Sequence, residues 1–132
     1  MKLVIGGYSQ GKLGAVLKNY KEDEVALVDG ELPDEKQLLE IREQGKTVIV
    51  HHFHHWVRNR MLQEKNPVAE INDYLKKYPE TIIISDEIGN GIVPVDAFER
   101  EYRERTGRIL VNLAEQADEV VRVICGIGQK IK

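Results

Sequence analysis

The sequence has few of the features that mark secreted, membrane-bound or nucleic-acid-binding proteins. Its single cysteine, Cys125, cannot form an internal disulfide. No apolar run approaches the roughly 20 residues that a membrane-spanning helix needs, and the amino terminus begins with a strand pattern instead of a signal peptide. With 19 Lys and Arg against 22 Asp and Glu, the chain also lacks the basic field that attracts nucleic acid or anionic lipid. We therefore expect a cytoplasmic protein with neither a nucleic-acid nor a membrane partner.

The composition predicts one folded domain. Of the 132 residues, 42% are hydrophobic and 31% are charged, which is the balance of a globular protein. A chain of this length buries about two-thirds of its unfolded surface in one core and is too short for two ordinary domains. Residues 1–132 are therefore expected to form a single domain.

Short apolar runs alternate along the chain with segments of helical periodicity. The runs that predict strands are 2–5, 25–28, 47–50, 81–85 and 119–124. Helices are expected over 11–20, 33–44 and 67–77, after Phe53 and after Asp96. Because parallel neighbouring strands need crossover connections, this alternation predicts an α/β fold in three layers. Its mostly parallel sheet would have about five strands with helices on both faces, and the tail 126–132 offers a further short edge strand.

Two of these helices carry specific expectations. In the helix 33–44, Leu38, Leu39 and Ile41 should form the inner face. In the long helix that Asp96 caps, Gly107 costs about 1 kcal/mol relative to alanine. A kink or a close packing contact is therefore expected at Gly107.

The first strand is followed by a glycine loop, residues 6–13, with the sequence GGYSQGKL. It matches the phosphate-binding pattern G-x-x-x-x-G-K and lies between a strand and a helix, as that pattern requires. In such a loop, backbone N–H groups bind phosphate oxygens and the lysine contacts the β- and γ-phosphates of ATP or GTP. The residues predicted to bind nucleotide are Gly6, Gly7, Tyr8, Ser9, Gln10, Gly11, Lys12 and Leu13. The alternative is a tight turn that binds no ligand.

One position of the loop departs from the pattern. Leu13 replaces the serine or threonine whose hydroxyl ligates Mg²⁺. We therefore expect the loop to hold phosphate while handling Mg²⁺ poorly.

Two adjacent acids, Asp86 and Glu87, follow the strand 81–85. Ligands of open α/β sheets bind at the carboxyl ends of the strands, so these side chains are candidates for ligand contact. We predict Lys12 and Glu87 as catalytic residues and Asp86 as a nucleotide-binding residue. The alternative role for both acids is to end the strand and cap loop N–H groups.

All four histidines of the chain fall within residues 51–55. If this segment were helical, His51 would share a face with His54 or His55, a spacing that can chelate a transition metal. A third ligand would have to come from Asp29, Asp86 or Glu87, so no metal site is assigned from the sequence alone. The alternative is a solvated polar rim at the end of a strand.

Several of these segments together resemble a known family. They are residues 85–94, 102–103, 107–108, 117–120 and 126–132, with the glycine loop, Trp56 and Asn59. Their pattern is similar to that of the bifunctional adenosylcobinamide kinase/adenosylcobinamide-phosphate guanylyltransferases of cobalamin biosynthesis. The resemblance implies a P-loop NTPase-like (RecA-like) fold, a cytosolic homo-oligomer, a nucleotide and a cobinamide-type corrinoid as ligands. It also implies two reactions, phosphorylation of the cobinamide hydroxyl and GMP transfer from GTP through a guanylylated histidine.

Against that family pattern the chain has three departures. Leu13 replaces the loop hydroxyl, and His51 stands where the family has its Walker-B aspartate. The region in which the family carries its GMP-accepting histidine is reduced here to residues 22–46, which contain no histidine. The leading hypothesis is therefore a nucleotide-binding member of the family with reduced or no catalysis. Two alternatives stay open: a guanylyltransferase that uses a histidine of residues 51–55, and a metal-binding protein built on the same histidines.

Overall fold

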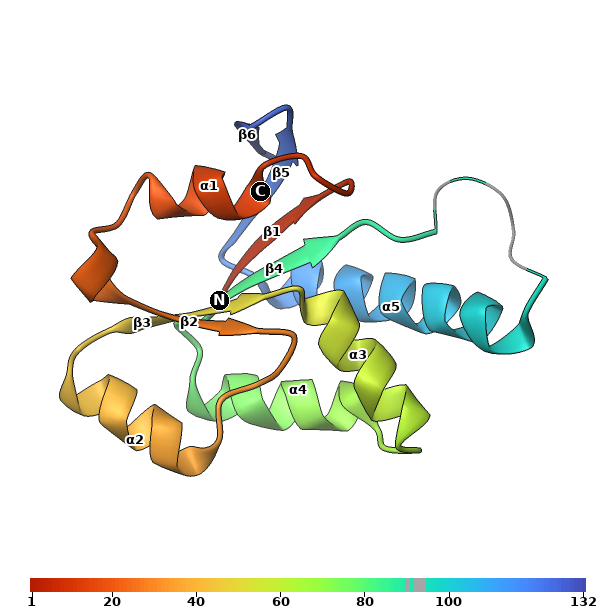
Figure 1. The fold of residues 1–132 in the computed structure, drawn as a ribbon, viewed down its shortest axis with the longest axis horizontal. Coiled ribbons are helices and arrows are strands. Elements are labelled where there is room, and N and C mark those ends of the chain that lie inside the picture. Colours follow the sequence, from red (N-terminus) through yellow and green to blue (C-terminus); the bar gives the residue numbers. More distant parts are fainter. Residues whose placement is uncertain (90, 92–94) are drawn as a thin grey trace.

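The computed structural model describes residues 1–89, 91 and 95–132. Residues 90 and 92–94, which belong to the segment 85–94 singled out above, lie outside the described residues. The described strands are β1 (Lys2–Gly6), β2 (Val25–Asp29), β3 (Thr47–His51), β4 (Ile82–Asp86), β5 (Glu119–Ile124) and β6 (Ile127–Lys130). The helices are α1 (Lys12–Leu17), the 3₁₀ turn η1 (Glu22–Glu24), α2 (Glu35–Glu43), α3 (Phe53–Leu62), α4 (Pro67–Lys77) and α5 (Ala97–Gln116) (Figure 1).

The strands form one sheet in the order β2-β3-β4-β1-β5-β6. The first five are parallel to one another, and β6 runs antiparallel to β5. The five strands expected from apolar runs are confirmed, and β6 is the short edge strand that the tail 126–132 offered. Cys125 and Gly126 both have positive φ, 51° and 76°, and form a two-residue hairpin turn that folds the tail back onto β5. Because every residue of β6 is exposed, hydrophobic alternation gives this strand no signal.

Side-chain alternation along the strands divides the interior into two clusters. Leu3, Val50, Ile83 and Val120 face the larger cluster, which α2, α3, α4 and α5 cover. The opposite cluster, which includes Val4, Ile49, Ile82, Ile84 and Val123, is covered by α1 (Figure 1). Helices on both faces are confirmed, with four on one side and one short helix on the other.

The helix boundaries follow local signals closely. Asn66 caps α4 by accepting a hydrogen bond from the N–H of Ala69 at 3.1 Å, and Pro67 occupies the first helical position. Asp96 caps α5 in the same way, accepting from Phe98 and Glu99. None of the described helices is both long enough and apolar enough to cross a membrane.

Two expectations for the helices are wrong. Leu39 of α2 is 60% exposed, so the inner face of this helix is formed by Leu38 and, less deeply, Ile41. This nine-residue helix buries only a narrow stripe of its surface against the sheet, and Leu39 lies outside that stripe. At Gly107 the helix α5 continues without a break, and a Cβ there would meet no atom within 4 Å. Gly107 is therefore not a close-packing position.

A candidate phosphate site at the carboxyl edge of the sheet

Four parallel strands end side by side at one edge of the sheet. In the strand register Gly6 of β1 lies opposite Asp86 of β4, and Asp29 of β2 lies opposite His51 of β3. Since β3 and β4 are also neighbours, the strand ends follow one another as Asp29, His51, Asp86 and Gly6. Parallel pairing thus gathers Asp29, His51 and Asp86 along one edge of the sheet, with Asp86 next to the strand from which the glycine loop continues.

The glycine loop connects β1 to α1 and has a constrained backbone. Ser9 and Gly11 both adopt positive φ, 55° and 81°. Gln10 ties the loop to the hairpin turn of β5 and β6, because its backbone oxygen accepts from Gly126 N and its Oε1 accepts from Cys125 N, both at 2.7 Å. At Gly6 a Cβ atom would lie 2.5 Å from the Val123 carbonyl oxygen, so only glycine fits there.

Lys12 is the first residue of α1, and its side chain is only 6% exposed. Its Nζ donates to the carbonyl oxygen of Gly7 at 2.7 Å and lies 2.6 Å from Asp86 Oδ1. The ammonium group of the loop is therefore paired with the carboxylate that ends β4.

Asp86 has a second partner in His54. The Asp86 N–H donates to His54 Nδ1 at 3.1 Å, so the proton of the neutral ring is on Nε2, which lies 3.3 Å from Asp86 Oδ2. Burial lowers the pKa of His54 to about 4, although the nearby carboxylate of Asp86 opposes this shift. The carbonyl oxygen of His54 accepts from the Tyr102 hydroxyl at 2.9 Å, which anchors α3 to α5. Neither His54 nor Tyr102 was predicted to support the site; the only signal in the sequence is the clustering of histidines.

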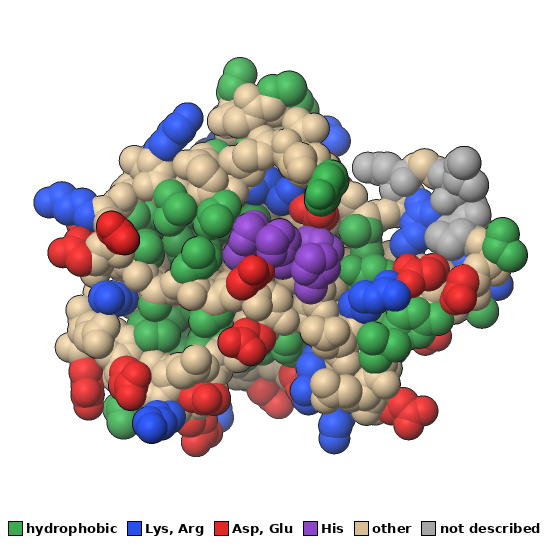
Figure 2. Space-filling view, viewed as in Figure 1, with side chains coloured by type: hydrophobic (Ala, Val, Ile, Leu, Met, Phe, Trp, Pro, Cys, Tyr) green, Lys and Arg blue, Asp and Glu red, His purple; other side chains and the backbone are tan. Residues whose placement is uncertain are grey.

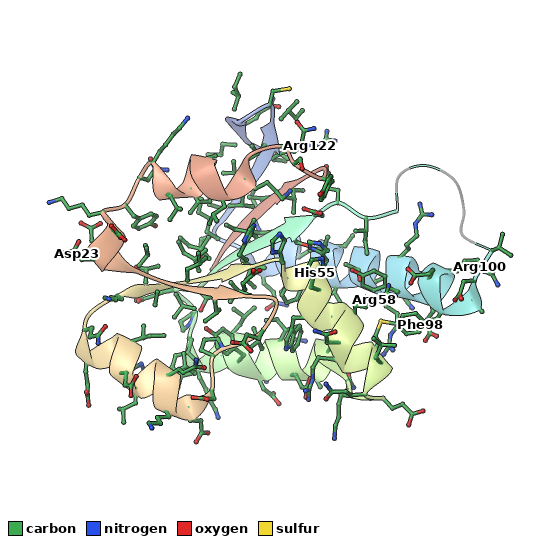
Figure 3. The ribbon with its side chains drawn as sticks, in the orientation of Figure 1. Asp23, His55, Arg58, Phe98, Arg100 and Arg122 are labelled. Atoms are coloured by element: carbon green, nitrogen blue, oxygen red, sulfur yellow. The ribbon has the colours of Figure 1, made fainter. Side chains whose placement is uncertain are left out.

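The histidine cluster does not lie on one helix, so the condition under which His51 would share a helical face with His54 or His55 is not met. His51 ends β3, and His52 precedes α3 with a left-handed backbone of φ 53° and ψ 46°. Only His54 and His55 are helical, in the first turn of α3. Figure 3 labels His55 at this end of the helix. The rings nevertheless gather in one patch (Figure 2), with centroids 3.7 Å apart for His51 and His52 and 4.8 Å for His52 and His55.

Asp29 completes this patch. Its Oδ1 contacts His52 Nδ1 directly and lies 3.9 Å from His51 Nδ1. The hydrogen bond with His52 lowers the pKa of Asp29, and burial lowers the pKa of His51. Within the described residues these three side chains each offer one ligand atom, and all three atoms lie within 4.8 Å of one another.

A pocket of about 330 Å³ opens between the glycine loop and the strand ends. It is lined by Tyr8, Ser9, Gln10, Gly11, Lys12, Leu13, Gly14, His51, His52 and Asp86. Most of the residues predicted to bind nucleotide therefore surround one cavity with Asp86. Gly6 and Gly7 are not in that lining.

Glu87 lies apart from this pocket. Its Oε2 is paired at 3.2 Å with Nε of Arg122, a residue of β5. Its backbone N–H donates to the carbonyl oxygen of Gly6 at 2.8 Å. In this structure Glu87 thus bonds to β1 through its backbone and to β5 through its side chain, and it does not line the cavity that Lys12 lines.

The pocket combines a cation, two imidazoles and a carboxylate with a glycine loop. A phosphate group is the ligand that suits such a loop, because backbone N–H groups and an ammonium group both stabilise its negative charge. Magnesium has a poor ligand set here, since Leu13 supplies no hydroxyl and Asp86 is occupied by Lys12 and His54.

The chain is similar to proteins of one family. The family model CobU, described as cobinamide kinase/cobinamide phosphate guanyltransferase, matches residues 8–131. The bifunctional adenosylcobalamin biosynthesis protein CobU of Salmonella typhimurium is 43% identical over 53 residues, and that of Escherichia coli K12 is 42% identical over 53 residues. Each alignment spans 40% of this chain and 29% of the relative's length.

Proposed function

Because the chain belongs to the cobinamide kinase/cobinamide phosphate guanyltransferase family, we propose that it binds ATP or GTP in cobalamin biosynthesis with reduced or no catalysis. One observation carries the proposal: the buried Lys12 ammonium lies in the wall of a pocket that the glycine loop forms. A lysine in this place is suited to the β- and γ-phosphates of a nucleotide.

Nucleotide binding would require an exchange of partners at Lys12. In this structure its ammonium group is held by Gly7 and Asp86. A triphosphate that enters the pocket would compete with the Asp86 carboxylate for this cation. Since phosphate presents more negative charge and more acceptor oxygens than a carboxylate, it can replace that partner while the loop N–H groups bind the remaining oxygens.

We expect reduced catalysis because two groups that would support a Mg²⁺ ion, a hydroxyl in the glycine loop and a carboxylate at the end of β3, are replaced in this chain. Phosphoryl transfer depends mainly on positioning and on charge neutralisation by Mg²⁺. Here Leu13 lies where the metal-binding hydroxyl would be, and β3 ends in His51. Removal of one such electrostatic contact commonly costs about 3–4 kcal/mol in the transition state, so two losses would slow turnover by several orders of magnitude. A cobinamide-type corrinoid as second ligand and a homo-oligomeric state stay predictions.

Isothermal titration with ATP and with GTP, each with and without Mg²⁺, tests the proposal. We expect binding of at least one nucleotide, little dependence on Mg²⁺, and loss of affinity in Lys12→Ala. Lys12→Gln keeps hydrogen-bond donors for Gly7 and Asp86 and should lose affinity while staying folded. Lys18→Ala is the matched control, because Lys18 caps the same helix but lies outside the pocket. No binding at millimolar nucleotide, or equal binding by both Lys12 variants and the native protein, would overturn the proposal.

Guanylyl transfer through the histidine cluster is the second candidate. It is favoured by the position of His51 and His52 in the same pocket as Lys12. An imidazole nitrogen would attack the α-phosphorus of GTP, forming a phosphorus–nitrogen bond as pyrophosphate leaves. Incubation with α-labelled GTP should then give a covalent adduct that a single histidine substitution abolishes. Absence of any adduct would reject this candidate without bearing on nucleotide affinity.

A further inference from the structure

We propose that Asp29, His51 and His52 form a binding site for a late first-row divalent metal ion such as Zn²⁺. Asp29 ends β2, His51 ends β3 and the adjacent His52 precedes α3, so two backbone segments distant in sequence converge on one point. Their ligand atoms lie within 4.8 Å of one another. This inference stands on the geometry of the three residues and does not depend on nucleotide binding.

The backbone at His52 brings the two imidazoles together. Successive side chains of a strand point to opposite faces, so a continued β3 would separate His51 from His52. The left-handed conformation at His52 places both rings on one side instead, stacked with their centroids 3.7 Å apart. For a residue other than glycine this conformation costs roughly 1–2 kcal/mol.

Strand pairing supplies the carboxylate. Asp29 lies opposite His51 in the register of β2 and β3, and the N–H of Gly30 donates to the His51 carbonyl oxygen at 2.8 Å. The Asp29 side chain is 66% exposed, so it can rotate without disturbing the core. Strand pairing therefore fixes the backbone of Asp29, while its exposed side chain is free to rotate toward a metal ion.

The separations suit a metal ion after a small adjustment. Zinc bonds of about 2.0–2.2 Å in tetrahedral geometry place neighbouring ligand atoms roughly 3.4 Å apart. His51 Nδ1 and Asp29 Oδ1 are 3.9 Å apart, and His52 Nδ1 already contacts the same oxygen. A metal ion would replace the hydrogen bond between His52 and Asp29 and draw His51 inward.

The donor atoms decide the class of metal. Two imidazole nitrogens and one carboxylate oxygen favour Zn²⁺, Co²⁺, Ni²⁺ or Cu²⁺ over Mg²⁺ or Ca²⁺, which prefer oxygen ligands. Three protein ligands leave one tetrahedral position for water or another small ligand. Because His51 and His52 also line the pocket with Lys12, a phosphate oxygen in that pocket is a suitable fourth ligand.

The other two histidines have different surroundings. His54 is engaged through both ring nitrogens with Asp86. His55 stacks on His52 with a centroid distance of 4.8 Å and is exposed, but it does not belong to the group of three ligand atoms. His55→Ala is therefore a matched control that removes a neighbouring histidine and keeps the site.

The experiment uses the untagged full chain, stripped of metal and free of nucleotide, titrated calorimetrically with Zn²⁺ and separately with Mg²⁺. We expect one Zn²⁺ per chain and no binding of Mg²⁺. His52→Gly and Asp29→Asn should each weaken Zn²⁺ binding by about tenfold or more, whereas His55→Ala should change it by less than about threefold. Glycine adopts the left-handed conformation freely, so His52→Gly keeps the local backbone. Circular dichroism checks that each variant is folded.

Two results would overturn the site: no stoichiometric Zn²⁺ binding, or an equal loss of affinity in His55→Ala and His52→Gly. The second result would mean a histidine-rich surface without a defined ligand set. Lys12→Ala separates this inference from the proposed function, because it should lose nucleotide affinity and keep Zn²⁺ affinity.

Discussion

Lys12 Nζ and Asp86 Oδ1 lie 2.6 Å apart, and their side chains are only 6% and 14% exposed. The cation of the glycine loop is thus neutralised by a carboxylate of the neighbouring strand. A buried pair of this kind is costly to break from one side, because the remaining charge keeps its desolvation penalty without its partner.

Replacing Asp86 by asparagine should therefore destabilise the protein and increase the stabilisation that added tripolyphosphate gives it. We expect Asp86→Asn to lower the free energy of unfolding by about 3 kcal/mol, measured by urea denaturation. Tripolyphosphate should raise the melting temperature of this variant more than that of the native protein, since it supplies the missing negative charge at Lys12. Asp23→Asn, at an exposed site in η1, is the control and should change neither quantity (Figure 3). An unchanged unfolding free energy in Asp86→Asn would contradict the prediction.

Two glycine substitutions should have opposite effects. A methyl group at Gly6 would lie 2.5 Å from the Val123 carbonyl oxygen, so Gly6→Ala must push β1 away from β5. We expect a loss of about 2 kcal/mol or more in unfolding free energy. Gly107→Ala meets open space within α5 and should gain about 0.5–1 kcal/mol. Urea denaturation of both variants checks this, and a similar sign for the two would contradict the steric assignment.

The sequence predicts those parts of the fold that rest on local chemistry. The cap at Asn66 and the proline at 67 fix the start of α4, and the β-branched run 47–50 identifies β3, because each signal is contained in a few adjacent residues. Strand β6 was expected only from the two glycines of the tail, since a fully exposed strand has no apolar period. Leu39 was misplaced because helical period alone does not say how wide a stripe the neighbouring elements cover.

The site was predictable in its parts but not in its connections. The glycine loop and Asp86 were identified from their positions after strands, and the structure places them around one pocket. The pairing of Lys12 with Asp86 depends on the sheet order, which brings β4 beside β1. The gathering of His51 and His52 depends on one left-handed residue, for which a histidine gives no strong sequence signal.

The position of Glu87, a residue predicted from the sequence to be catalytic, can be tested by substitution. Its side chain is paired with Arg122 and lies outside the lining of the pocket. We therefore expect Glu87→Gln to change nucleotide affinity by less than about threefold, a difference below 0.7 kcal/mol. Calorimetric titration against the native protein measures this. A large loss of affinity would mean that Glu87 turns toward the pocket when nucleotide binds.

The buried hydroxyl of Tyr102 should make the protein sensitive to alkali. Burial raises the pKa of Tyr102 to about 12, while the tyrosine pKa in an unfolded chain is about 10. Below pH 10 both states keep the proton, and this group adds no pH dependence. Between pH 10 and 12 only the unfolded state releases it, so the unfolding free energy should fall with rising pH, by at most about 2–3 kcal/mol.

The variant Tyr102→Phe isolates this contribution. At neutral pH it should cost about 1 kcal/mol, because the carbonyl oxygen of His54 loses its hydrogen bond. Above pH 10 its unfolding free energy should fall less steeply than that of the native protein, although Tyr74, whose pKa burial also raises, keeps part of the slope. Tyr8→Phe is the control, since it removes a hydroxyl from a side chain that is 85% exposed. Denaturation series at several pH values measure the slopes. Equal slopes for Tyr102→Phe and the native protein would show that this hydroxyl ionises as readily in the folded chain as in the unfolded one. That result would contradict the raised pKa that its burial between α5 and α3 predicts.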